Sequence, residues 1–241
     1  MLLTVFDIDG TLCRTSGIDD SCWIRTAREL FGVEKLSTDW SDYPHSTDES
    51  IAATLLGDHL RAEPTREDLD RVRDHFVELV RRTHRQDPAT IQPTPGAVAL
   101  LGHLRRQGHA VSIATGGWTG SATTKLEHSG FEWRGIPAAF ACDARPREEI
   151  IATSMQRSAE AHDRPVDSFA GAVYFGDGSW DLAASRCLGV GFIGVAEGPR
   201  AERLREGGAR FVVPDLRDHS GILSILNRHG SDPDSFFRPV G

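Results

Sequence analysis

Apolar residues along the chain follow two different periods, and the change between them divides the sequence into regions. Residues 2–6 form a short apolar run that ends in acidic residues and a glycine, a pattern typical of a strand buried on both faces. From residue 14 to residue 92, apolar positions recur at helical spacing instead. This block, 14–92, predicts helices over residues 18–31, from Ser46 onward and from Thr65 onward, and no strand.

After residue 92 the chain alternates between apolar runs of strand length and segments of helix length. Strands that alternate with helices of roughly 8–15 residues form a parallel sheet with helices on both faces, so this region predicts a doubly wound, Rossmann-like α/β core. The first strand belongs to the same sheet. We therefore expect a core of residues 1–13 and 93–241, with an inserted all-helical cap domain over residues 14–92. Strands are expected at 109–114, 138–142, 172–175, 191–195 and 210–213, and helices at 96–107, 120–129, 147–161, 181–188 and 199–206.

Composition excludes several classes of partner. The 241 residues carry 27 Lys and Arg against 35 Asp and Glu, a formal net charge of −8 at pH 7, without a long run of one sign. This balance argues against nucleic acid or a membrane surface as the main partner. The longest apolar stretches, residues 110–114 and 191–196, are far shorter than the ~20 residues of a spanning helix. With no signal-peptide pattern and four scattered cysteines, we expect a cytoplasmic protein without a zinc site, and the pattern does not indicate an oligomeric state.

Carboxylates follow the predicted strands at the points where the strands end. Asp7 and Asp9 close the first strand, and side chains two residues apart in a strand point to the same side, roughly 6–7 Å apart. Asp177 follows the fourth strand, and Asp181 lies one helical turn further on. Because ligands of open α/β sheets bind at the carboxyl ends of the strands, all four carboxylates face one crevice. They repel one another unless a cation lies among them, so the sequence predicts a Mg²⁺ site there.

A second polar segment follows the predicted strand at 109–114. Thr115, Gly116 and Gly117 stand just before a helix, where free backbone N–H groups form a cradle for phosphoryl oxygens. Arg145, just past the third strand, can add positive charge. Each of these segments alone is also typical of an ordinary turn, loop or helix start. Turn chemistry does not explain, however, why acids gather at one edge of the sheet.

Four segments together resemble the motifs of the haloacid dehalogenase-like superfamily. Residues 6–12 (Phe-Asp-Ile-Asp-Gly-Thr-Leu) resemble the first motif and residues 113–117 the second. Residues 145–150 (Arg-Pro-Arg-Glu-Glu-Ile) and 176–181 (Gly-Asp-Gly-Ser-Trp-Asp) resemble the third and fourth. The resemblance covers essentially the full chain. A helical insertion between the first two motifs matches members with a helical cap, such as phosphoglycolate phosphatase-like and β-phosphoglucomutase-like proteins.

The resemblance implies a Mg²⁺-dependent phosphatase that hydrolyses a small phosphorylated metabolite through an aspartyl-phosphate. In such a mechanism Asp7 is the nucleophile, and Asp9 protonates the leaving group and later activates water. Mg²⁺ is held by Asp7, the backbone carbonyl of Asp9 and Asp177. The residues implied to support the metal through water or to hold phosphoryl oxygens are Asp181, Thr115 and Arg145.

The third motif departs from the family, which usually has a lysine where this chain has Arg145. Arginine binds oxygen pairs through a wider, forked group, so the two residues are not equivalent. Arg147 is the second candidate for this position. Lys125 is a weaker one, because it lies about ten residues into the helix after Thr115, roughly 15 Å along the axis, and is expected to point to solvent.

Two other activities remain open. An acid at position 9 favours phosphate esters over the carbon–halogen and phosphonate chemistries of the family, but it is compatible with a β-phosphoglucomutase-like phosphomutase. A mutase needs a group on the cap that assists the second transfer, and His45 or Lys35 would have to serve. A non-catalytic phospho-ligand-binding protein is a further alternative, although such proteins typically lose the nucleophile or the acid, and this chain keeps both.

The segment before the second cap helix is a candidate specificity loop. His45, Thr47 and Asp48 stand where related caps close over the edge of the sheet, and we expect them to contact substrate. The same cluster of hydroxyl and acidic residues is also typical of helix capping. Trp118 directly follows the second motif and Trp180 stands within the fourth, so both are candidates to wall the site.

Overall fold

The core of the protein is a parallel sheet in which the first strand of the chain lies in the interior. Later strands are added first on one side of it and then on the other. The structure, a computed structural model, describes residues 1–15, 17–60 and 63–238. Within them, six strands pair in the order β5-β4-β1-β6-β7-β8, all parallel. The doubly wound fold predicted from the sequence is confirmed. The strands are β1 (Leu3–Phe6), β4 (Ala110–Ala114), β5 (Ala138–Ala139), β6 (Ala172–Gly176), β7 (Gly191–Val195) and β8 (Phe211–Val213).

Helices cover both faces of this sheet because successive side chains of a strand point to opposite sides. In β1, Leu3 and Val5 join the apolar cluster on one face, which includes side chains of α6, α7 and α8. Phe6 joins the cluster on the other face, with side chains of α4, α5 and α9. The helices are α4 (Ala97–Arg106), α5 (Thr119–His128), α6 (Arg147–Ala161), α7 (Ser179–Leu188), α8 (Gly198–Glu206) and α9 (His219–His229).

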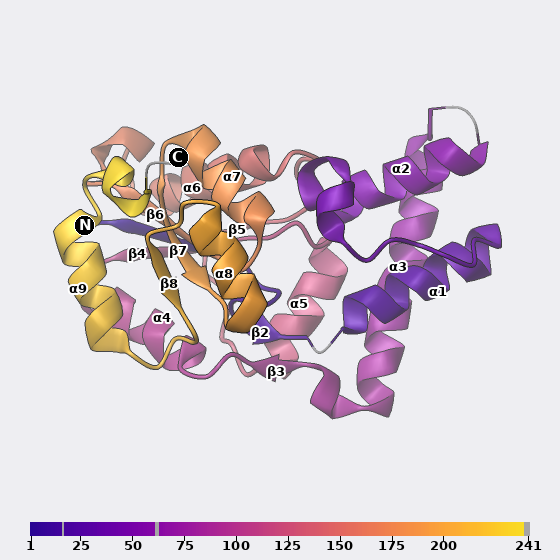
Figure 1. The fold of residues 1–241 in the computed structure, drawn as a ribbon, viewed down its shortest axis with the longest axis horizontal. Helices are drawn as coiled ribbons and strands as arrows, with labels where there is room; N and C mark the ends of the chain where they lie inside the picture. Colours follow the sequence, from indigo (N-terminus) through magenta and orange to yellow (C-terminus); the bar gives the residue numbers. More distant parts are fainter. Residues whose placement is uncertain (16, 61–62, 239–241) are drawn as a thin grey trace.

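A separate helical lobe is inserted after β1 and lies at one end of the sheet (Figure 1). It is built from α1 (Ile18–Phe31), α2 (Asp48–Leu60) and α3 (Arg66–Gln86). The chain leaves the core through β2 (Cys13–Arg14) and returns through β3 (Gln92–Pro93), which pair with each other in antiparallel fashion. The inserted helical cap is thus confirmed, while its boundaries at residues 14 and 92 stay a prediction. Residues 16 and 61–62 of the expected cap and 239–241 of the expected core lie outside the described residues.

The cap and the core share a buried aromatic cluster. The ring of Trp23 in α1 lies 4.7 Å from that of Phe76 in α3 and 5.5 Å from that of Trp118, measured between centroids. Trp118 immediately precedes α5 of the core, and its ring meets Phe76 edge-on at 5.7 Å. All three side chains are fully or almost fully buried. Aromatic burial on this scale ties the helical lobe firmly to the core.

Several local details differ from the sequence prediction. The helix expected from Ser46 begins at Asp48, because Ser46 has a positive φ of 49° and belongs to a preceding 3₁₀ turn. The Thr47 hydroxyl accepts the Ser50 N–H at 3.3 Å and caps the helix instead. The strand expected at 138–142 is only two residues long. The expectation of no strand within residues 14–92 is wrong at its two ends, where Arg14 and Gln92 belong to the pair β2–β3, because strands of two residues carry no periodicity. Helix α9 was not predicted either. Of the helices in the described residues, none has the length and apolar character needed to cross a lipid bilayer.

Candidate active site

Three buried carboxylates converge at the carboxyl ends of β1 and β6. Each of Asp7, Asp177 and Asp181 offers an oxygen, and the three oxygens all lie within 4.8 Å of one another. Asp181 stands in the first turn of α7, where its Oδ2 accepts the backbone N–H groups of Asp177 at 3.1 Å and Gly178 at 2.9 Å. These bonds fix Asp181 behind the other two. Of the four acids that the sequence placed in one crevice, three form this cluster, and the fourth, Asp9, lines the same cavity as Asp7 and Asp177.

Gly10 allows the carboxylate of Asp177 to approach the loop after β1. Its φ is +74°, and a Cβ at this position would lie 2.0 Å from Asp177 Oδ2. A side chain would therefore collide with the acidic cluster and would strain the backbone as well. The glycine shapes the space in which a bound ion would meet Asp177.

The cluster needs positive charge. Burial, and next the charge of Asp181, raise the pKa of Asp7 well above its usual value. Burial and the charge of Asp181 likewise raise the pKa of Asp177 to about 7. Shifts of this kind mark carboxyl groups that repel one another in a poorly solvated site. Three oxygen donors of this type, in a space that Gly10 keeps open, fit a hard divalent cation such as Mg²⁺.

Arg147 supplies buried positive charge beside the nucleophile candidate. Its Nη1 lies 2.9 Å from Asp181 Oδ1 and 3.6 Å from Asp7 Oδ1, and its Nη2 donates to the Ser46 carbonyl at 2.6 Å. Arg145, in contrast, is exposed, and its backbone carbonyl accepts the Thr47 hydroxyl. These contacts favour Arg147 over Arg145 as the cation of the site. The reason is that α6 begins at Arg147, so the side chain of that residue leaves the first helical turn toward the sheet edge.

The side chain of Asp9 pairs with a lysine and is not one of the three clustered carboxylates. Lys125 Nζ lies 2.7 Å from Asp9 Oδ1 and 2.9 Å from Oδ2. The same ammonium bonds both oxygens of Asp19, at 2.8 and 2.7 Å. The prediction that Lys125 points to solvent is wrong, since the residue is 1% exposed. Helix α5 begins at Thr119 and runs along the junction between core and cap, so Lys125, in its second turn, still lies beside the loop after β1.

The second motif lines a small inner cavity. Thr115 is buried and its Oγ1 accepts the Gly117 N–H at 3.2 Å. The next N–H, of Trp118, is not free for substrate, because it donates to Asp48 Oδ2 at 2.8 Å. The cavity has a volume of about 80 Å³, room for a small group such as a phosphoryl. Its walls include Asp7, Asp9, Asp48, Thr115, Gly116, Gly117, Lys125, Arg147 and Asp177.

Of the three cap residues expected to contact substrate, one reaches this cavity. Asp48 lines it, and its Oδ1 also accepts the Trp23 Nε1–H at 3.1 Å. The Thr47 hydroxyl is used for the Arg145 carbonyl at 2.8 Å, and His45 is exposed. The carbonyl of Ser46, which the sequence did not single out, is the acceptor for Arg147. Ser46, Thr47 and Asp48 thus all bond to residues of the core.

A larger outer cleft opens from the inner cavity between cap and core. It has a volume of about 510 Å³, within the range of small-molecule sites. Trp180 lines both spaces, as expected of a residue that walls the site, whereas Trp118 lies in the buried aromatic cluster. Further residues of this cleft are Arg14, Asp19, Asp20, Trp40 and Arg200.

Among these cleft residues, Arg200 contacts the carboxylate cluster. It stands in the first turn of α8 and pairs with Asp177. The rule that located the other acids, namely that residues after parallel strands gather at one edge, also applies to the segment after β7 and could have indicated it. Asp19 and Trp40 come from the cap, where no comparable rule exists.

Comparisons with known proteins give a family and a set of similar folds. The family model of haloacid dehalogenase-like hydrolases matches residues 1–189. A hydrolase from Pseudomonas syringae has 22% identity and a TM-score of 0.70, with 96% of this chain and 100% of that chain covered. CbbY from Rhodobacter sphaeroides, solved in complex with phosphate, has 19% identity and a TM-score of 0.64, covering 90% and 95%. A search of curated proteins finds no matching relative. At these identities the solved structures show a shared fold.

Proposed function

Because the chain belongs to the haloacid dehalogenase-like hydrolase family, we propose that it is a Mg²⁺-dependent phosphatase acting on a small phosphorylated metabolite through an aspartyl-phosphate. The observation that carries this proposal is the setting of Asp7. Its carboxylate is buried 3.6 Å from Arg147 and within 4.8 Å of the oxygens of Asp177 and Asp181. A nucleophile so placed attacks a group whose negative charge the surrounding cations neutralise.

In the first step, a carboxylate oxygen of Asp7 forms a bond to phosphorus while the bond between phosphorus and the leaving oxygen breaks. Asp9 donates a proton to that oxygen, so the product leaves as an alcohol. Arg147 and Thr115, both on the wall of the inner cavity, hold the non-bridging oxygens, which carry the charge of the transition state. The leaving group lies in the outer cleft, which is large enough for a small metabolite.

In the second step, Asp9 takes a proton from water, whose oxygen attacks phosphorus and releases the carboxylate of Asp7 together with inorganic phosphate. Bound Mg²⁺, held by Asp7, the carbonyl of Asp9 and Asp177, would neutralise charge on the phosphoryl group. Asp181 orients this set, because two backbone N–H groups and Arg147 hold its own carboxylate.

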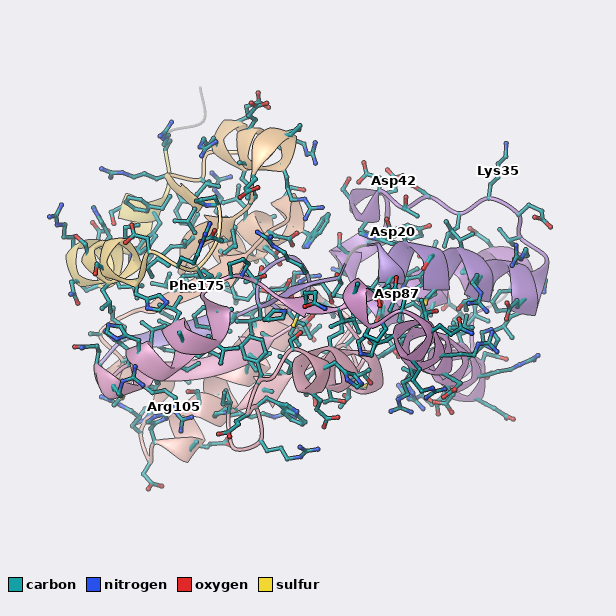
Figure 2. All side chains as sticks on the ribbon, turned by 90° about the horizontal axis from the view of Figure 1, so that it is seen from below. Asp20, Lys35, Asp42, Asp87, Arg105 and Phe175 are labelled. Carbon is teal, nitrogen blue, oxygen red and sulfur yellow. The ribbon has the colours of Figure 1, made fainter. Side chains whose placement is uncertain are left out.

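The cap residues favour hydrolysis over mutase chemistry. A mutase of this type needs a cap group that assists transfer to a second hydroxyl. His45 is exposed, and Lys35 lies at the outer end of the helical lobe, away from the sheet (Figure 2). Neither of these two lines the inner cavity or the outer cleft. We further propose residues 14–92 as the cap and residues 1–13 with 93–241 as the core, and a cytoplasmic location stays a prediction.

Release of nitrophenol and phosphate from p-nitrophenyl phosphate, with Mg²⁺ or with a chelator, tests the proposal. Hydrolysis is expected only with the metal, and Asp7→Asn is expected to abolish it, while the exposed Asp167→Asn in the turn Val166–Ser168 serves as the matched control. Activity that survives in Asp7→Asn would refute the assigned nucleophile. A panel of phosphorylated sugars, acids and nucleotides then defines the substrate, and isomerised sugar phosphate without free phosphate would indicate the mutase instead.

A further inference from the structure

Lys125 is a buried charge that the two chemical steps do not use. It is one of two lysines in the chain, and its ammonium bonds carboxylates from two parts of the molecule. Asp9 belongs to the loop after β1 of the core, and Asp19 stands in the first turn of α1 of the cap. Burying an ammonium costs several kcal/mol, and an apolar side chain of similar volume often stabilises such a position at least as well. A buried ion triad is therefore better explained by what it orients than by stability.

The contacts show what the ammonium can orient. A lysine has only donors, and here they are directed at the oxygens of Asp9 and Asp19. The side chain of Asp9 is still 30% exposed, toward the cleft where the leaving group lies. Without the ammonium, this short side chain can rotate in the open cleft. Because one ammonium bonds both carboxylates, it links the loop after β1 to the first turn of α1.

We propose that Lys125 and Asp19 are positioning residues for Asp9, and that proton transfer to the leaving group therefore depends on the place of cap helix α1. The inference rests on the proposed phosphatase activity. Lys125 fixes the direction of the Asp9 carboxyl, and Asp19 fixes Lys125 from the cap. A cap displaced from the core withdraws Asp19 and leaves the acid unaligned, so the site is complete only when α1 is docked.

Two substrates of similar shape separate this role from a merely structural one. Phenyl phosphate needs a proton on its leaving oxygen far more than p-nitrophenyl phosphate does, because nitrophenolate is a stable anion. The ratio of their kcat/KM values reports the step in which the bond to the leaving group breaks, and Asp9→Asn calibrates the full loss of the acid. Lys125→Met is expected to lower kcat/KM for phenyl phosphate about tenfold to a hundredfold, and for p-nitrophenyl phosphate less than about threefold.

The other lysine provides the matched control, since Lys35→Met makes the same substitution at an exposed site of the cap and is expected to leave both values unchanged. Asp19→Asn leaves Lys125 paired with Asp9 but removes the cap carboxylate that holds the ammonium. We therefore expect kcat/KM for phenyl phosphate again to fall more than kcat/KM for p-nitrophenyl phosphate, by a smaller factor than in Lys125→Met. If Lys125→Met does not fold, the ratio of the two kcat/KM values in Asp19→Asn tests the positioning role instead. An equal loss on both substrates, or no loss, overturns the positioning role. Absence of hydrolysis in the unmodified protein, or hydrolysis by Asp7→Asn, refutes instead the phosphatase assignment.

Discussion

Replacement of Arg147 by methionine tests which arginine completes the site. The substitution keeps most of the apolar stem and removes the guanidinium, which lies 2.9 Å from Asp181, 3.6 Å from Asp7 and 2.6 Å from the Ser46 carbonyl. The matched substitution, Arg145→Met, removes the same group from an exposed side chain two residues earlier. The sequence alone favoured Arg145, whereas the contacts favour Arg147, so the pair of variants shows which of the two assignments is correct.

The contacts set the size of the expected effect. Arg147→Met leaves buried carboxylates without their counter-charge, which costs about 3–5 kcal/mol of unfolding free energy. For a chain of this length about 1 kcal/mol shifts Tm by roughly 2–4 °C, so a loss of roughly 6–20 °C is expected. Loss of a donor to the transferring group lowers kcat by about 10²–10³-fold. At the exposed Arg145, the change in stability stays within about 0.5 kcal/mol and activity is retained.

Thermal unfolding of the metal-free variants and steady-state hydrolysis of p-nitrophenyl phosphate measure the two effects. Arg147→Lys is a useful third variant, because an ammonium restores charge but cannot reach three acceptors with the fork of a guanidinium. It is expected to recover part of the stability and little of the rate. An active Arg147→Met protein beside an inactive Arg145→Met protein would show that the motif, and not the observed packing, identifies the cation.

Two more predictions concern the acidic cluster. Folded Asp177 has a pKa of about 7, whereas an unfolded aspartate titrates near 4, so the folded state binds this proton more tightly and metal-free stability falls as pH rises from about 4 to 7. Mg²⁺ is expected to raise Tm more at about pH 8 than at about pH 5, measured against a chelator; an equal rise contradicts binding at these carboxylates. Gly10→Ala, with φ +74° and a clash at 2.0 Å, is expected to lower stability by about 1–3 kcal/mol and to raise the Mg²⁺ requirement. Gly32 has a similar φ of +67°, but no atom from elsewhere in the described chain lies within 4 Å of a Cβ placed there, so Gly32→Ala is the matched control for backbone strain without a clash. A raised Mg²⁺ requirement in both variants would show that the clash with Asp177 is not the cause.

The sequence could predict the acids because a general rule places them. Parallel strands present their carboxyl ends at one edge, so Asp7, Asp177 and Asp181 had to approach one another once the strands were recognised. The choice between Arg145 and Arg147 depended on where α6 begins, and two residues of the same type on either side of Pro146 leave that choice open. Only the helix start, which directs the Arg147 side chain inward, decides it.

The contacts between cap and core lay beyond local pattern. Lys125 and Asp19 are 106 residues apart, and nothing near either residue indicates that a side chain of α5 meets the first turn of α1. A lysine deep in an amphipathic helix is ordinarily solvated, and the prediction failed because a second lobe covers that face. The hydrogen bond from the Trp118 N–H to Asp48 likewise joins residues 70 apart. Predictions from strand ends succeed where topology alone brings residues together, and they fail where two lobes meet.

The aromatic cluster limits how freely the inserted lobe can be exchanged. Trp118 belongs to the core by chain position, but its ring packs on Trp23 and Phe76 of the lobe. A lobe grafted from a relative must therefore supply a matching aromatic pocket, or the indole is left facing water at the mouth of the second motif. In this protein the insertion is not an interchangeable module, and its evolution has to proceed in step with position 118.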